Sequence, residues 1–401
     1  PVVAVTGTNG KSTVAALIHA VLQRTGTRSA LVGNTRYGPP LSAAPNWASA
    51  LVCEVSSYQL EACPTFVPAV AVFTNLSRDH LHRHGSMARY GDCKRGVFRR
   101  GARGVPLAVI NADDPFGRRL AHEVRSAGGR CVLYGRHPSA DYRIRSCTWT
   151  LTDSHIEIAT PRGDLALRPS LPGAHNASNV AAALALAGSL GAGDDDAKAG
   201  LEEAQAPPGR FESVVAGHPF DVVVDYAHTP DGFRQTLATA RRILDDRGHG
   251  RLRVVAGTVG GHDPAEQRQS GRILCSNADD LVLTSSNLRG ERPLPIVQDM
   301  LRGARSVDGA TVRVVLDRRA AIGEAVTDAR AGDLVLVLGR GALTRQMLDR
   351  SGIWHDFDDR AVVRALLSSP CRPPVAARRS APGRPRVLAT AAGPEPETPP
   401  R

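Results

Sequence analysis

Short runs of apolar residues alternate with amphipathic stretches along most of the chain. The first run, VVAVTG at 2–7, predicts a buried strand, and the apolar residues after it recur at helical spacing. Similar runs predict further strands at 29–34, 50–56, 69–76, 106–112 and 130–135. Because strands that alternate with helices form parallel sheets covered by helices, this pattern predicts an α/β fold with a mostly parallel sheet.

The pattern changes after residue 140. Alternating segments between 142 and 170, separated by turn residues, predict a small antiparallel patch. The stretch HNASNVAAALALAGSL at 175–190 predicts a helix capped by an Asn. APPGRFE at 206–212 contains two prolines and a glycine and predicts a domain boundary. A second α/β series follows, with strands expected at 221–227, 251–258, 280–286, 312–317 and 333–339.

These changes predict two domains and a tail. We expect one α/β domain at 1–207, a second at 208–369, and a disordered segment at 370–401, where nine of 32 residues are Pro. No apolar run approaches the ~18 residues of a membrane span, and no secretory signal is visible before the first predicted strand. We therefore expect a cytoplasmic protein without membrane association.

The formal net charge of +11 raises the question of nucleic-acid binding. Six Arg and two Glu place +4 of this charge in 370–401, which leaves +7 over the other 369 residues. Basic stripes with interleaved aromatic residues are absent from the sequence, and aromatic residues make up only 4%. We therefore expect no nucleic-acid partner. The seven cysteines fit neither a disulfide framework nor C-x-x-C metal spacing.

The strongest chemical signal is GTNGKST at 7–13, between a predicted strand and a predicted helix. The backbone N–H groups of such a loop can surround phosphate oxygens, Lys11 can reach the β and γ phosphates, and Ser12 can ligate Mg²⁺. Only two residues separate Gly7 from Gly10, whereas the usual loop has four before its Gly-Lys pair, so the bare pattern is less specific. The alternative is a glycine turn that merely opens a helix. The strand and helix context favours phosphate binding.

Polar side chains also follow the next two strands that should lie beside this loop. Glu54 ends one predicted strand, and Asp79, His80, His82 and His84 come after another. Taken alone, such residues more often lie in a solvated loop than bind a metal. Their placement beside a nucleotide loop favours a magnesium site, because a cation that bridges phosphates needs only one or two protein ligands.

Lys94 is an exception in this composition. The chain has 47 Arg and three Lys, at 11, 94 and 198, so a surface position does not explain why residue 94 is not Arg. A Lys can lose its proton and use its nitrogen as a nucleophile, whereas an Arg stays charged. We therefore predict that Lys94 has a chemical role.

A series of motifs resembles the Mur ligase family of ATP-dependent amide ligases, which build the stem peptide of peptidoglycan and include folylpolyglutamate synthase. In chain order the motifs are GTNGKST, EVSSYQLE, FTNLSRDHLHRHGSMARYGDCKRGVF, NADDP, LPGAHNASN, PGRFE and DYAHTPDG. The first half is similar to the MurD type and the part from PGRFE onward to the MurE type. The resemblance implies a P-loop-type central ATPase domain and a Rossmann-like C-terminal domain, with the active site between them.

The resemblance also implies roles for matching positions. Ser12, Glu54 and His80 would ligate magnesium, and Lys94 would be carbamylated by CO₂ and bind a second magnesium. Lys11, His80 and Lys94 would be catalytic. The implied nucleotide-binding set is Gly7, Thr8, Asn9, Gly10, Lys11, Ser12, Thr13, Asn176 and Asn179, joined from the C-terminal domain by Arg210, Asp225 and His228.

The implied reaction consumes ATP in two steps. A substrate carboxylate attacks the γ-phosphorus to give an acyl phosphate, and an amine then attacks the acyl carbon and releases phosphate. The protein positions the reactants and neutralises charge, so no side-chain nucleophile is required. We therefore predict an ATP- and Mg²⁺-dependent ligase that joins a small-molecule acid to an amino acid.

The chain departs from the family pattern where substrates should bind. The diaminopimelate motif DNPR reads Ser286, Asn287, Leu288 and Arg289, and a Gly-His-Glu motif reads Gly341, Ala342 and Leu343. We expect Asn287 and Arg289 at the amine substrate, with the Arg289 guanidinium on its carboxylate. The alternative for Arg289 is a solvated loop residue. The acidic partner for a distal ammonium group of the amine is missing at Ala342 and Leu343.

Three interpretations of the function remain open at this stage. The predicted P-loop strand begins at residue 2, where relatives have an N-terminal domain for the uridine nucleotide. With the altered amine motif, this favours a ligase of specialised metabolism that acts on a different acid. The alternatives are a shortened peptidoglycan enzyme acting on a UDP-MurNAc-peptide and a non-catalytic nucleotide-binding regulator.

Overall fold

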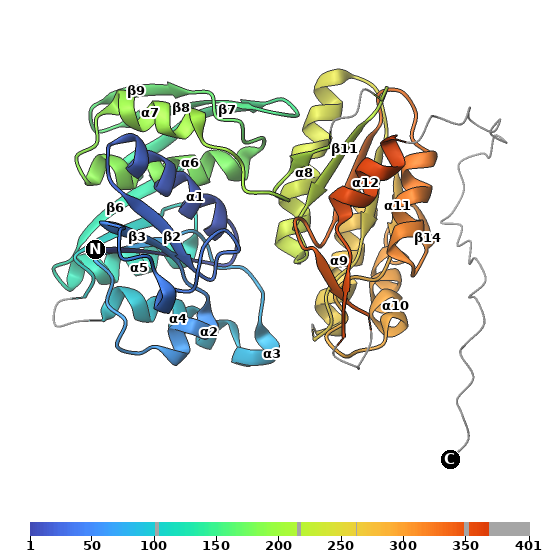
Figure 1. Ribbon diagram of the computed structural model, residues 1–401, viewed down its shortest axis with the longest axis horizontal. Helices are drawn as coiled ribbons and strands as arrows, with labels where there is room; N and C mark the ends of the chain where they lie inside the picture. Colours follow the sequence, from blue (N-terminus) through green and yellow to red (C-terminus); the bar gives the residue numbers. More distant parts are fainter. Residues whose placement is uncertain (101–103, 215–217, 262, 349–352, 369–401) are drawn as a thin grey trace, which may run out of the picture. The chain divides into compact units, whose positions relative to one another are not determined.

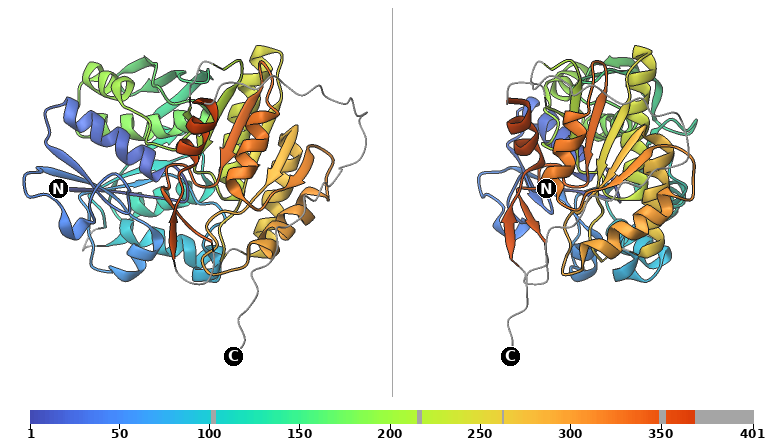
Figure 2. Two further views of the ribbon diagram at one scale, coloured as in Figure 1. Left: turned by 45° about the vertical axis from the view of Figure 1, so that its right-hand side comes forward. Right: turned by 90° about the vertical axis from the view of Figure 1, so that its right-hand side faces the viewer.

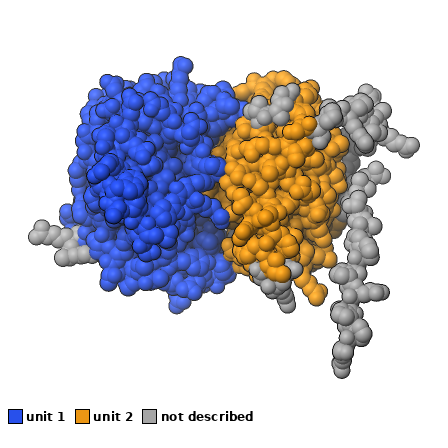
Figure 3. All heavy atoms as spheres, viewed as in Figure 1, with its two compact units in different colours: residues 1–208 blue, residues 209–401 orange. Residues whose placement is uncertain are grey.

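The computed structural model of the protein describes residues 1–100, 104–214, 218–261, 263–348 and 353–368. The chain divides into two compact units, residues 1–208 and 209–401, which Figure 3 shows in different colours. The tail expected at 370–401 lies outside the described residues. None of the helices in the described part of the chain has the length and apolarity that a membrane span requires.

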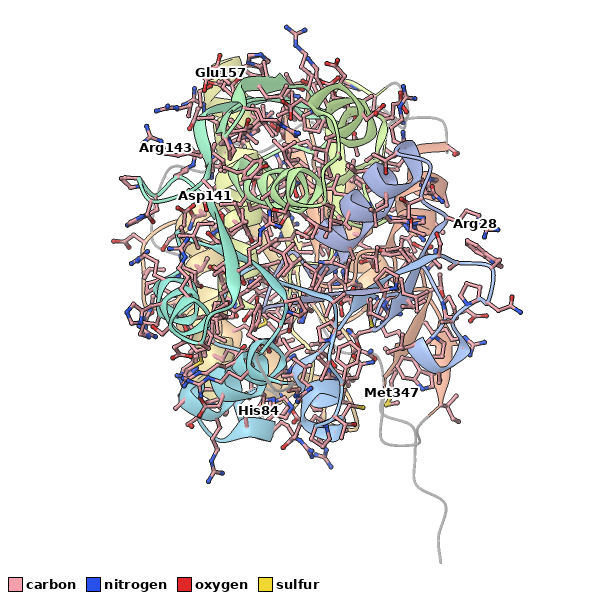
Figure 4. The ribbon with its side chains drawn as sticks, turned by 90° about the vertical axis from the view of Figure 1, so that its left-hand side faces the viewer. Arg28, His84, Asp141, Arg143, Glu157 and Met347 are labelled. Atoms are coloured by element: carbon pink, nitrogen blue, oxygen red, sulfur yellow. The ribbon has the colours of Figure 1, made fainter. Side chains whose placement is uncertain are left out.

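A nine-stranded sheet forms the centre of the described part of the first unit. Its strands are β1 (Val2–Thr6), β2 (Ser29–Gly33), β3 (Ala50–Glu54), β4 (Val70–Phe73), β5 (Leu107–Asn111), β6 (Arg130–Gly135), β7 (Tyr142–Trp149), β8 (Ser154–Thr160) and β9 (Gly163–Leu167). Their order is β2-β3-β1-β4-β5-β6-β7-β8-β9, with β1 to β7 parallel and β8 and β9 antiparallel. The mostly parallel sheet and the antiparallel patch are both confirmed. Figure 4 labels Arg143 on β7 and Glu157 on β8.

Alternate side chains of the central strands enter two separate cores. Val3 and Val5 of β1 pack in the core with α1 (Lys11–Arg24) and α6 (Ala174–Ser189), whereas Ala4 packs in the core on the other face. Helices on both faces therefore bury the strands (Figures 1 and 2). The remaining helices are α2 (Ser57–Ala62), α3 (Leu81–His84), α4 (Met87–Arg99), α5 (Pro115–Ser126), α7 (Asp194–Glu203) and a 3₁₀ helix at Leu41–Ala43.

The expected Asn cap of α6 is wrong. The helix begins at Ala174, one residue after Gly173, whose φ of 103° lets the chain turn into the helix. Asn176 lies inside the first turn, where its side-chain amide donates to the carbonyl of Pro172 at 2.8 Å. The Asn side chain therefore satisfies a carbonyl before the helix and does not accept from its N–H groups.

The second unit contains a six-stranded sheet in its described residues. Its strands are β10 (Glu212–Ser213), β11 (Asp221–Asp225), β12 (Leu252–Ala256), β13 (Asp280–Leu283), β14 (Thr311–Val314) and β15 (Leu334–Leu338). The order is β10-β11-β15-β12-β13-β14, and all pairs except β10 with β11 are parallel. A separate antiparallel hairpin joins β16 (Arg345–Met347) and β17 (Trp354–Asp356).

Local sequence signals define the helices that cover this second sheet. The helices are α8 (Pro230–Arg247), α9 (Pro264–Asn277), α10 (Pro293–Ala304), α11 (Arg318–Thr327) and α12 (Asp359–Ser368), shown in Figure 1. For α8, the Thr229 hydroxyl accepts from the N–H of Gly232, and Pro230 occupies the first turn. Gly248 then ends the helix in the left-handed conformation with φ 72°. A mostly parallel sheet covered by helices agrees with the expected α/β class.

Candidate active site

The carboxyl ends of three neighbouring strands meet at one edge of the first sheet. β1 lies between β3 and β4, and the chain passes from β1 to β2 and β3 on one side before it crosses to β4 on the other. Open α/β sheets bind ligands at such a reversal of strand order. The GTNGKST loop follows β1, Glu54 is the last residue of β3, and the segment that leads to His80 follows β4.

The loop at 7–10 is held in one conformation by the segment after β4. The N–H groups of Thr8 and Asn9 donate to Asn75, and the Thr74 hydroxyl donates to the carbonyl of Asn9 at 2.7 Å. Gly10 has φ 83°, and a Cβ there would come within 2.5 Å of Asn179. No described side chain caps α1 at Gly10, so its first-turn N–H groups suit an anion. The loop is therefore fixed by its neighbours, and residue 10 must be a glycine for Asn179 to pack against it.

Lys11 is the first residue of α1. Its ammonium donates to the carbonyl of Thr8 at 2.7 Å, and the side chain is half-buried. The positive charge therefore lies at the loop itself. Thr13, in the same helical turn, is buried, with 5% of its surface exposed.

Ser12 and Glu54, both predicted to ligate magnesium, are in direct contact. The Ser12 hydroxyl donates to the Glu54 carboxylate at 2.7 Å, and the Asn34 amide donates to its other oxygen at 3.2 Å. Glu54 is only 3% exposed. Asn34 was not predicted from the sequence, although it follows β2 at the same sheet edge. Across the described residues, no group of three or more His, Cys, Asp or Glu is placed to hold a metal by itself.

His80 lies in a strained position beside a buried acid. Its φ is 55°, and its Nε2 is 3.3 Å from the carboxylate of Asp79, which is 5% exposed. The aromatic rings of Tyr58 and Tyr90 contact the imidazole edge-on, with centroids 5.2 and 6.0 Å away. Asp79 and two tyrosines therefore help to position the His80 imidazole.

Lys94 is buried directly beneath the phosphate loop. It is 1% exposed, its ammonium nitrogen donates to the carbonyl of Gly7 at 2.7 Å, and it lies 4.5 Å from the centre of the Tyr90 ring. Burial, followed by the positive charge of Lys11, lowers the pKa of Lys94 well below its usual value. The Lys94 ammonium therefore loses its proton more easily than that of an exposed lysine.

Tyr90 is a site residue that sequence reasoning missed. Its hydroxyl is 3.1 Å from the Thr8 hydroxyl, and burial raises its pKa, so the phenol stays neutral. The signal in the sequence is its spacing of four residues from Lys94, which puts both side chains on one face of α4.

Asn176 and Asn179 contact each other at the start of α6. The Asn179 amide donates to the Asn176 side-chain oxygen at 2.9 Å, and both residues are buried. Asn179 also lies against Gly10, where a Cβ would collide with it. The structure thus links the residues expected near adenine to the phosphate loop.

The three predicted nucleotide contacts of the second unit lie around the end of β11. The Arg210 guanidinium is 4.6 Å from the Tyr226 ring centre, and the His228 imidazole packs on the same ring at 4.7 Å. The Asp225 carboxylate accepts from the N–H groups of Phe211 and Ala227, both at 2.7 Å. Asp225 therefore fixes the segments that carry Arg210 and His228.

Asn287 and Arg289 lie on the loop after β13. The Asn287 side-chain oxygen accepts from the N–H of Met347 at 3.0 Å, whereas Arg289 is exposed. Ala342 and Leu343 follow β15, and Leu343 is 7% exposed.

Backbone strain coincides with these predicted positions. Among the described residues other than glycine, only His80, Phe211 and Arg289 have positive φ, at 55°, 47° and 47°. Two are predicted site residues, and Phe211 directly follows a third. Each such conformation costs about 1–3 kcal/mol and is typical of functional sites.

Comparisons with known proteins agree with the division of the chain into two units. A model of the Mur ligase middle domain matches residues 5–187, and one of the Mur ligase glutamate ligase domain matches 209–341. UDP-N-acetylmuramoyl-L-alanyl-D-glutamate--2,6-diaminopimelate ligase of Chromobacterium violaceum is 38% identical over 390 residues, 92% of this chain and 77% of that protein. A solved structure of a ligase with the same name is 30% identical, with a TM-score of 0.62 over 92% of this chain and 78% of the other.

A more distant solved structure shows the same fold. Folylpolyglutamate synthase of Mycobacterium tuberculosis, solved with ADP and AMPPCP, has a TM-score of 0.68 and covers 93% of this chain and 92% of its own. At 19% identity this likeness concerns the fold alone.

Proposed function

The chain belongs to the Mur ligase family of ATP-dependent ligases, and we propose that it joins a substrate carboxylate to the amino group of an amino acid. One observation carries this proposal. Lys11, the Ser12–Glu54 pair and the buried Lys94 all lie at the glycine-containing loop between β1 and α1. The carboxylate would attack the γ-phosphorus of ATP and release ADP. The amine nitrogen would then attack the acyl carbon, lose a proton and release phosphate, leaving an amide.

The loop fits the triphosphate, and the oxygen donors beside it fit magnesium. ATP with Mg²⁺ would supply the phosphoryl group that activates the acid. Lys11 and the N–H groups of α1 would bind phosphate oxygens, and the Ser12 hydroxyl and Glu54 carboxylate would hold the cation, since Mg²⁺ prefers oxygen ligands. His80 would add a further ligand from the neighbouring strand end. The residues Gly7, Thr8, Asn9, Gly10 and Thr13 shape the loop, and Asn176 and Asn179 would face the base.

Carbamylation of Lys94 is part of this proposal. The neutral Lys94 amine would attack CO₂ to form a carbamate and release one proton. Its burial and lowered pKa keep the nitrogen lone pair available, and its contact with Gly7 places the new anion under the phosphate loop. This anion would hold a second magnesium, which an ammonium group cannot do.

We further propose that the amine substrate carries a free carboxylate that Arg289 binds. Arg289 is exposed at the carboxyl end of a parallel sheet, and a guanidinium forms bidentate pairs with carboxylates. Relatives are named for 2,6-diaminopimelate, whose second amino group is cationic. Ala342 and Leu343 offer no charge to such a group, so an amino acid with an uncharged side chain is the better fit.

The acid is proposed to be a carboxylate at the end of a peptide-like substrate. The relatives are named for the substrate UDP-N-acetylmuramoyl-L-alanyl-D-glutamate, and the match to them extends over 92% of this chain. An acid of specialised metabolism is the second candidate, favoured by the altered amine motif at 286–289.

A matrix of acids and amines with Mg-ATP tests the proposal. The acids include UDP-N-acetylmuramoyl-L-alanyl-D-glutamate, and the amines include 2,6-diaminopimelate and apolar amino acids. We expect ADP release that requires both partners, together with a product whose mass equals acid plus amine minus water. ADP release that no acid accelerates, or a product without the amine, contradicts the proposal.

A further inference from the structure

The loop that carries Arg289 is held by strand β16 on one side. The Gln346 side-chain amide donates to the carbonyl of Ser286 at 2.9 Å, and the N–H of Leu288 donates to the carbonyl of Met347 at 3.0 Å. The N–H of Met347 in turn donates to the Asn287 side chain at 3.0 Å. Gln346 is 2% exposed, so its hydrogen bond is shielded from water. Figure 4 labels Met347, which lies on this strand.

The turn after β12 holds the same loop from a second side. The N–H of Gly260 donates to the carbonyl of Asn287 at 2.9 Å, and the N–H of Gly261 donates to the Glu291 carboxylate at 2.8 Å. Gly260 lies so close that a Cβ there would collide with the carbonyl oxygen of Leu288. Residue 260 must therefore be glycine for the turn and the loop to approach this closely.

Arg289 is presented by a loop that is otherwise tied down. Leu288 is 1% exposed, and Ser286, Asn287, Leu288 and Glu291 each form a hydrogen bond to β16 or to the turn. Arg289 is exposed and has the strained φ of 47°. A strained residue persists only where its surroundings fix it. The contacts of Gln346 and Gly260 therefore hold the backbone from which the Arg289 side chain extends.

We infer that Gln346 and Gly260 are positioning residues that set the selectivity of the ligase for the carboxylate of its amine substrate. They do so by holding the Ser286–Glu291 loop so that Arg289 is preorganised to receive a carboxylate. The inference rests on the proposed role of Arg289. We also infer that the Asn287 side-chain oxygen holds the loop in place and does not bind the substrate, because it accepts a hydrogen bond from the N–H of Met347. Binding by a guanidinium depends on its orientation, so loss of either support weakens amine binding without touching the ATP site.

Two variants test this inference from opposite sides of the loop. Gln346→Met has a similar length but lacks the donor to Ser286, and Gly260→Ala adds the colliding Cβ. Gly323→Ala is the matched glycine control, because its Cβ has no atom within 4 Å and Gly323 lies in α11, away from the loop contacts described above. Steady-state KM and kcat are measured for the amino acid, its carboxyl-amidated analogue and ATP, together with thermal unfolding.

We expect KM for the amino acid to rise about tenfold in Gln346→Met and Gly260→Ala, with kcat and KM for ATP unchanged, which is the sign of lost substrate binding. The preference over the amidated analogue should fall to the same extent. Adding Arg289→Ala to either variant should cause no further loss, because all three changes remove one interaction. Gly323→Ala should retain wild-type constants.

The outcomes separate this inference from the proposed function. If Arg289→Ala raises KM for the amino acid but Gln346→Met and Gly260→Ala only lower the melting temperature, the two residues are merely structural and the inference is overturned. If Arg289→Ala has no effect on the preference for the free carboxylate, the proposed role of Arg289 fails. Should Gln346→Met not fold, Gly260→Ala decides the question alone.

Discussion

Replacing Glu54 by Gln separates the charge of this side chain from its shape. Glu54 is 3% exposed and accepts hydrogen bonds from Ser12 and Asn34. A glutamine of the same length can accept from Asn34 with its oxygen and donate to the Ser12 hydroxyl, which rotates to accept. Both hydrogen bonds are kept, so we expect the free energy of unfolding to change by about 1 kcal/mol or less.

The same substitution removes the negative charge that we propose for magnesium binding. Loss of one preorganised electrostatic contact to a reacting phosphoryl group typically lowers kcat by a factor of about 100 to 1,000. We therefore expect Glu54→Gln to reduce the rate of ADP release by at least about a hundredfold while the protein stays folded. A higher magnesium concentration should be needed for half-maximal rate.

The assay compares initial rates of ADP release across a magnesium titration with thermal unfolding followed by circular dichroism. Glu61→Gln is the matched control, because Glu61 lies on exposed α2 surface and pairs with Arg83 at 2.9 Å. This control should retain the wild-type rate and magnesium dependence. The assignment of Glu54 is refuted if its variant keeps more than about a tenth of the rate at the wild-type magnesium requirement. A large loss of stability would refute the hydrogen-bond argument.

Three further changes test the other parts of the site. Lys11→Ala should abolish ADP release at an unchanged melting temperature, and more than about a tenth of the wild-type rate would contradict its phosphate role. Lys94→Arg should be inactive and lose the carbamate signal from isotopically labelled bicarbonate in NMR spectra, because a guanidinium stays charged; normal turnover would exclude the carbamate. Burial alone would raise the pKa of Asp279, but hydrogen bonds from Arg241 and Leu252 lower it. Asp279→Asn should therefore destabilise the protein at neutral pH, and its melting-temperature deficit should begin to shrink as the pH falls below about 4 and vanish only once the pH passes the lowered pKa of the folded state; a constant deficit would contradict this.

The central strands could be predicted from the sequence because they are buried on both faces of their sheets. Val70–Phe73 and Leu334–Leu338 are uninterrupted apolar runs, and every residue in them is buried. The hairpin of β16 and β17 was not predicted, because strands of three residues are too short to show a period. The cap of α6 was mistaken because an Asn near a helix start can bond backward to a carbonyl as well as forward to an N–H.

The candidate site could be predicted in part, for a topological reason. Glu54 ends β3, and Ser12 lies in the first turn of the helix that follows β1. Because β1 and β3 are parallel neighbours, the contact between the two residues follows from the strand order. Tyr90 could not be assigned, since a phenol that packs on a lysine has no fixed motif. The contact between Gln346 and Ser286 joins residues 60 positions apart through a carbonyl, and backbone acceptors leave no trace in the sequence.

Two of the three lysines donate to adjacent carbonyls of the loop at 7–10. Lys11 donates to the carbonyl of Thr8 and Lys94 to the carbonyl of Gly7, so the two side-chain nitrogens lie close to each other. The positive charge of Lys11 therefore helps to lower the pKa of Lys94. A buried Arg at position 94 would keep its charge, and the repulsion between the two side chains would remain. A neutral Lys94 amine removes that repulsion, and the proposed carbamate would reverse it into an attraction. Electrostatics therefore disfavours the otherwise preferred Arg at position 94, and the carbamate that we propose requires a side chain that can lose its charge.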